Sequence, residues 1–92
     1  MRLDLWLRRV CLLKSRSLAK RGCRSGDILL AGEPVKESHA LRPGEILTLR
    51  FPSREMEIEV LVIPEGNVPK KEAASHYRVI EERATGDSRI EI

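Results

Sequence analysis

The run RLDLWLRRVCLLKSRSLAKRGCRSG, residues 2–26, contains the helix signals from which the expected fold follows. Ser15 is a typical helix N-cap and Gly26 a typical residue just past a helix end, so a helix is expected from Arg16 to about Arg24. A first helix is expected before it, because apolar residues recur with the spacing of one helix face at Leu3, Trp6, Leu7, Val10 and Leu13. This apolar face predicts that both helices pack on the rest of the chain.

The same region concentrates positive charge. The first 24 residues hold eight basic residues and one acidic residue, a net charge of +7, although the whole chain carries only +3. Such asymmetry in a small chain favours a polyanionic partner, with nucleic acid as the first candidate. Arg16, Lys20 and Arg24 recur every four residues and therefore predict one basic ridge on the second helix.

Beyond Gly26 the sequence pattern changes from helical to extended. Turn residues separate short apolar or alternating runs, which predict strands at residues 27–31, 34–36, 46–51 and 56–63. A last helix is expected within residues 67–84, because Pro69 suits a helix start and Ala73, Tyr77, Ile80 and Ala84 share a helical spacing.

These elements predict an α+β fold: two short helices on a small, mainly antiparallel sheet, with a C-terminal helix packed on the same domain. The expected division is residues 1–66 for the main unit and 67–84 for the C-terminal helix. Residues 85–92 show no period and are expected to form a flexible tail.

Several classes of function are disfavoured by composition. Cys11 and Cys23 lack metal-binding spacing and are expected to be free thiols, and His39 and His76 have no ligand cluster around them. Neither a cofactor nor a metal is therefore expected.

Ser15 has no base spaced to activate it, so helix capping accounts for it and a non-enzymatic protein is expected. With no signal peptide and no apolar run long enough to cross a bilayer, a cytoplasmic protein is predicted.

The scarcity of aromatic residues narrows the expected target. Proteins that read single strands stack bases on exposed aromatic rings. The chain has one Trp, one Tyr and one Phe, and Trp6 lies on the apolar face of the first helix. Structured RNA or DNA, contacted through its backbone, is therefore the favoured target.

Three runs of this sequence together resemble the S4 domain, the αL RNA-binding motif: RLDLWL (2–7), KSRSLAKRGCRSGDILLAGEPVKES (14–38) and LRPGEILTLR (41–50). The chain departs from the family at Ala31, where Asn is usual, and at Cys11, where Arg is frequent. The resemblance and the ridge together give the expected RNA-binding residues: Arg2, Arg8, Arg9, Lys14, Ser15, Arg16, Lys20, Arg24 and Lys36.

Within that family the chain resembles stand-alone proteins of ribosome-associated quality control, and it is close to the small S4 heat-shock protein. The resemblance implies non-enzymatic binding to large-subunit rRNA and peptidyl-tRNA. It also implies a role in C-terminal tailing of stalled chains beside a tailing factor of the NEMF family. A monomer with no membrane partner is expected. The slightly acidic end of this chain favours this type over the heat-shock type, which continues into a basic tail.

Three alternatives stay open at this level. One is heat-shock-type recycling of free large subunits that carry peptidyl-tRNA. Another is a DNA-binding regulator, because two short helices with a basic second one also suggest a helix-turn-helix. The third is a protein-interaction module that uses the acidic side of the strand with Glu55, Glu57 and Glu59.

Overall fold

The computed structural model describes residues 1–84, so the predicted flexible tail, residues 85–92, lies outside the described residues. The α+β class is confirmed. In chain order the elements are α1 (Leu3–Arg9), α2 (Arg16–Ser25), β1 (Ile28–Leu30), β2 (Glu33–Pro34), β3 (Ile46–Arg50), β4 (Arg54–Val60), α3 (Lys70–Ala73), a 3-10 turn (Ala74–His76) and β5 (Tyr77–Ala84).

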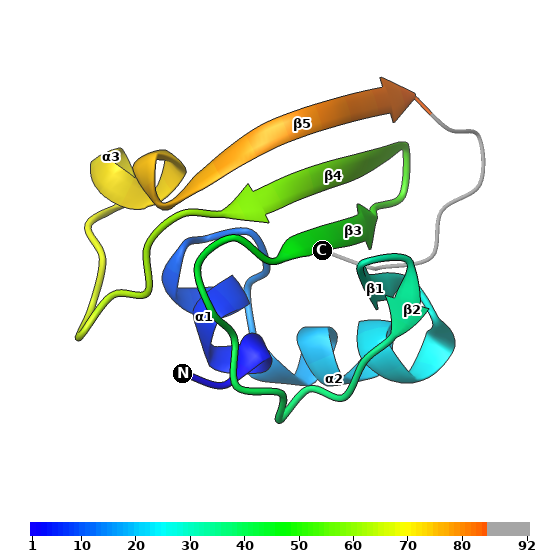
Figure 1. Cartoon of the computed structure of the whole chain (residues 1–92), viewed down its shortest axis with the longest axis horizontal. Coiled ribbons are helices and arrows are strands. Elements are labelled where there is room, and N and C mark those ends of the chain that lie inside the picture. Colours follow the sequence, from blue (N-terminus) through cyan, green and yellow to red (C-terminus); the bar gives the residue numbers. More distant parts are fainter. Residues whose placement is uncertain (85–92) are drawn as a thin grey trace.

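The strands form one antiparallel sheet in the order β2-β1-β3-β4-β5, and α1 and α2 lie together against it (Figure 1). Alternate residues of β3 and β4 point towards the helices, which is the period-two pattern of a half-buried sheet. The resulting core joins α1 to the central strands through Leu3, Trp6, Leu7, Leu47, Leu49, Met56, Ile58 and Val60.

The second helix forms as predicted. Ser15 Oγ accepts a hydrogen bond from the Leu18 amide at 3.2 Å, and Gly26 ends the helix with φ of 81°. Ala19, Gly22 and Cys23 are buried on the inner face of α2. Packing on α1 therefore holds this short helix in spite of the glycine inside it.

The first helix is shorter than its apolar pattern predicts. It ends at Arg9, because Cys11 adopts a left-handed φ of 61° that an α-helix does not continue through. The amides of Leu12 and Leu13 then both donate to the Leu7 carbonyl. Leu13 is nevertheless buried, so the apolar pattern identifies core residues correctly beyond the end of the helix.

The predicted C-terminal helix over residues 67–84 is wrong. Only Lys70–Ala73 is α-helical, and Tyr77–Ala84 instead forms β5 along β4. The open edge of β4 offers backbone groups that need partners, and β-branched Val79 and Ile80 suit a strand. Ile80 is accommodated in a β-bulge, because Ile58 pairs with Val79 and Glu57 with Glu81. The division at residue 66 stays a prediction.

The turn between β1 and β2 places Ala31 at φ 50° and Gly32 at φ 79°, as in the two-residue hairpin loops that favour Asn-Gly. Alanine is strained at positive φ, whereas asparagine tolerates it. Ala31→Asn is therefore expected to raise the free energy of unfolding by about 0.5–1 kcal/mol and the melting temperature by about 2–8 °C in thermal unfolding. As the control, Ala31→Val should lower both; equal melting of all three proteins would contradict the strain at this turn.

Candidate nucleic-acid interface

A buried carboxylate organises the basic N-terminal region. The Asp4 side chain is only 5% exposed, whereas those of Arg2 and Arg16 are 49% and 47% exposed. Asp4 accepts from Nε and an η-nitrogen of Arg2 at 3.1 and 3.2 Å, and its Oδ2 lies 3.4 Å from Nε of Arg16. Asp4 Oδ1 also accepts from the Leu5 amide at 2.8 Å, so the carboxylate itself is fixed on α1. The Asp4 clamp, as we call Asp4 with Arg2 and Arg16, thus joins the starts of α1 and α2.

The α2 ridge, which comprises Arg16, Lys20 and Arg24, is exposed along the outer face of α2. Its three cations are spaced about one helical turn apart, while the opposite face of the helix is buried against α1. Ser15 caps the helix directly before the ridge, and its oxygen is engaged by the Leu18 amide. Ser15 therefore has a structural role as a helix cap, and its contact with RNA stays a prediction.

Lys36 lies beside the C-terminal half of α2. It lines a pocket of about 400 Å³ together with Cys23, Arg24, Val35, Glu37 and Ser38. The structure thus brings Lys36 and Arg24 together, with Glu37 next to them. Burial, and secondarily the negative charges of Glu37 and Asp4, raise the pKa of the Cys23 thiol to about 11. This thiol is therefore neutral near pH 7 and offers no nucleophile or ready metal ligand.

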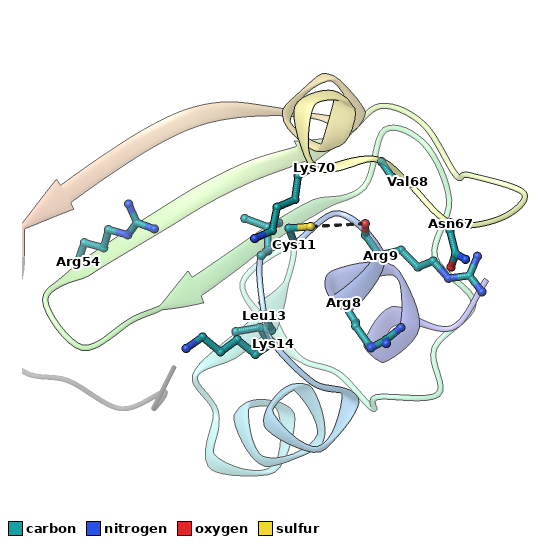
Figure 2. Close-up of a pocket in the computed structure, with 10 residues that line it drawn as sticks. Arg8, Arg9, Cys11, Leu13, Lys14, Arg54, Asn67, Val68 and Lys70 are labelled. Carbon is teal, nitrogen blue, oxygen red and sulfur yellow. Dashed lines mark hydrogen bonds between the residues drawn. The ribbon is translucent and has the colours of Figure 1, made fainter.

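Arg8, Arg9 and Lys14 belong to a separate group. They line a pocket of about 680 Å³ between α1, the α1–α2 linker, β4 and the segment that leads into α3 (Figure 2). We call it the basic pocket; its lining residues are Arg8, Arg9, Cys11, Leu12, Leu13, Lys14, Arg54, Asn67, Val68 and Lys70. The nine predicted residues therefore do not form one continuous ridge.

Neither Arg54 nor Lys70 is among the RNA-binding residues expected from the sequence. Arg54 lies in what the sequence presents as a turn, 40 residues along the chain from Lys14. No local pattern signals that these residues meet. Their common pocket follows only from the tertiary fold.

The strand face that carries Glu55, Glu57 and Glu59 is less acidic than its sequence suggests. Glu55 pairs with Arg50 at 3.0 Å and with Arg83 at 3.1 Å, and Glu59 pairs with Arg78 at 2.7 Å. These arginines come from β3 and β5, the neighbours of β4 on either side. Two of the three glutamates on this face are thus ion-paired, which weakens the case for an acidic docking surface.

Within residues 1–84, no three metal-ligating side chains cluster, and no helix is long and apolar enough to span a membrane. Cys11 and Cys23 are free thiols, the first exposed and the second buried.

Comparisons with known proteins agree with this geometry. The S4 domain family model matches residues 1–47. The chain is 34% identical over 87 residues to the RQC P-site tRNA stabilizing factor of Bacillus subtilis, covering 95% of this chain and 100% of that protein. It is 36% identical over 73 residues to the factor of the same name from Helicobacter pylori, covering 78% and 87%. Heat Shock Protein 15 of Vibrio cholerae, whose structure is described as trimeric, matches with a TM-score of 0.80 and 32% identity, covering 86% of this chain and 80% of that one.

Proposed function

This chain belongs to the S4 domain family and, over nearly its whole length, to the proteins named RQC P-site tRNA stabilizing factor, and on that premise we propose that it stabilises P-site tRNA on the large ribosomal subunit during ribosome-associated quality control. In this role it binds structured rRNA and tRNA. Their phosphates are the partner that a densely basic N-terminal region favours.

The observation that carries the proposal is the Asp4 clamp at the start of the α2 ridge. Asp4 holds Arg2 through Nε and one η-nitrogen and pairs with Nε of Arg16, which leaves at least one η-nitrogen of each guanidinium group for a phosphate. Side chains already held in place lose less conformational entropy when RNA binds. The scaffold therefore favours contact with RNA of defined shape over a diffuse attraction between charges.

In this proposal the protein binds RNA without catalysing a reaction, and it does so in the cytoplasm as a monomer. Its partners are large-subunit rRNA, peptidyl-tRNA and, by resemblance, a NEMF-family tailing factor. Ser15, the side chain most open to interpretation as a nucleophile, is held as a helix cap. Holding peptidyl-tRNA in place needs affinity and shape rather than bond chemistry.

The likeness to Heat Shock Protein 15 supports a second candidate function, the recycling of free large subunits that carry peptidyl-tRNA. The two functions differ in what happens to the nascent chain. Tailing assays with a NEMF-family factor separate them: stimulation of C-terminal tailing by this protein favours the first function, and release of peptidyl-tRNA without tailing favours the second.

The direct test measures binding to large subunits that carry P-site tRNA, by co-sedimentation at several salt concentrations. Arg16→Ala combined with Lys20→Ala should weaken binding about tenfold and lower the log–log salt slope by about 1.4–1.8, because two phosphate contacts are lost. The wild-type protein should also slow dissociation of peptidyl-tRNA from isolated large subunits.

Arg78→Ala combined with Arg83→Ala is the matched control, since it removes the same charge from β5. Binding by this control should stay near the wild-type level. If both double variants bound large subunits like the wild type, the α2 ridge would not be the RNA-binding surface, and without slower peptidyl-tRNA dissociation the proposed function would fail.

A further inference from the structure

The basic pocket has an unusual charge composition for a protein surface. Of its ten lining residues five are cationic (Arg8, Arg9, Lys14, Arg54 and Lys70), and none is a carboxylate. Ordinary soluble surfaces intersperse both signs. A concave site lined by one sign of charge focuses its field and attracts ions of the opposite sign.

Most of this charge has no internal partner within residues 1–84. Arg8, Lys14 and Lys70 make no ion pair there, and Nε of Arg9 is buried without a hydrogen-bond partner. Only Arg54 is engaged: it lies 3.4 Å from Glu82 and over the ring of Phe51. Cations gathered without acids repel one another, so an anionic ligand would relieve this repulsion.

The pocket is built by the fold rather than by loose side chains. Trp6 donates from Nε1 to the Val62 carbonyl at 3.0 Å and packs edge-on against Tyr77, with ring centroids 6.4 Å apart. These contacts hold the segment between β4 and β5 against α1. Arg54, Asn67, Val68 and Lys70 come from outside residues 1–47, the part that the S4 family model matches.

We propose that the basic pocket binds successive backbone phosphates of the RNA, as a second contact that adjoins the α2 ridge. The proposal rests on the proposed function. Lys14 belongs to the pocket and directly precedes Ser15 and Arg16, so RNA on the ridge reaches the pocket without leaving the protein surface.

The arrangement of the cations favours an RNA strand over a small phosphate compound. Lys14, Lys70 and Arg54 approach one side of the pocket from three separate segments, whereas Arg9 extends to the other side beside Asn67 (Figure 2). A single phosphate group calls for donors that converge on one point. Cations set apart match the repeated charges of a backbone.

The test compares Lys70→Gln with Lys71→Gln, a neighbour on α3 that is exposed and does not line the pocket. The probe is again large subunits carrying P-site tRNA. Lys70→Gln should lower the log–log salt slope by about 0.7–0.9 and Lys71→Gln should leave it unchanged. Adding Arg54→Gln to Lys70→Gln should lower it by about as much again, with thermal unfolding used to verify that the variant folds.

Wild-type slopes for Lys70→Gln and for the folded double variant would overturn the pocket proposal. The proposed function would still stand if Arg16→Ala with Lys20→Ala lost binding in the same assay. A second experiment titrates AMP and inorganic phosphate into the protein and follows amide shifts around Lys70 by NMR. Saturation by either compound at micromolar concentration would identify a small-ligand site and overturn the proposal; weak millimolar binding supports RNA as the occupant.

Discussion

Asp4→Ala is expected to lower the free energy of unfolding by about 2–3 kcal/mol, because it removes at once the acceptor of two hydrogen bonds from Arg2 and one from the Leu5 amide, and the ion pair with Arg16. The loss is smaller than for a fully buried ion pair, since both arginines are half-exposed and can turn to water. Urea unfolding monitored by the fluorescence of Trp6 measures it.

The same variant should also bind large subunits severalfold more weakly, although it makes the protein more positive. Added positive charge by itself strengthens attraction to RNA. Weaker binding therefore reports the lost orientation of Arg2 and Arg16 rather than a lost charge. Asp4→Asn is the control: its amide oxygen still accepts from Leu5 and part of the stability should return, while the ion pairs do not. Tighter RNA binding by Asp4→Ala would contradict the positioning role of the Asp4 clamp.

Trp6→Ala is expected to have the largest effect on stability, about 3–5 kcal/mol, since Trp6 is fully buried in the centre of the core. A domain of this size has a total stability of roughly 5–14 kcal/mol, so the loss removes a large part of it. Equilibrium unfolding in urea, followed by circular dichroism because the fluorophore is lost, gives the value.

Trp6→Phe separates packing from hydrogen bonding at the same position. Phenylalanine keeps most of the apolar contact but leaves the Val62 carbonyl without its donor, which should cost about 1–3 kcal/mol. Because that bond holds the chain after β4 against α1, this variant should also weaken the contribution of Lys70 to RNA binding. Wild-type stability in Trp6→Phe would show that the indole hydrogen bond contributes nothing to this attachment.

The sequence predicts correctly those features of the fold that depend on residues close together in the chain. Ser15 and Gly26 bracket α2 because capping chemistry depends on residues within a few positions of the helix ends. The apolar spacing from Leu3 to Leu13 identifies core residues correctly. It does not locate the end of α1. The helix stops because the backbone of Cys11 adopts a left-handed conformation, and the spacing of apolar residues contains no information about that conformation.

The secondary structure of residues 77–84 is determined by pairing with a strand that is distant in the sequence. Tyr77, Ile80 and Ala84 fit a helical spacing, yet the unpaired edge of β4 recruits this segment as a strand. In the candidate site, too, some features follow from local sequence and others depend on the tertiary fold. Ridge positions on α2 follow from spacing alone, whereas the meeting of Arg54 and Lys70 with Lys14 depends on how β4 and α3 fold back over α1.

The bulge at Ile80 has a consequence for self-association. Within residues 1–84, β5 is an edge strand of the sheet, and a regular edge with exposed Val79 and Ile80 would be a template for another strand. The bulge breaks the repeat of its backbone groups, and the charged side chains along β5 disfavour close docking (Arg78, Glu81, Glu82 and Arg83). β5 can therefore complete the sheet and protect β4 without itself becoming a seed for aggregation.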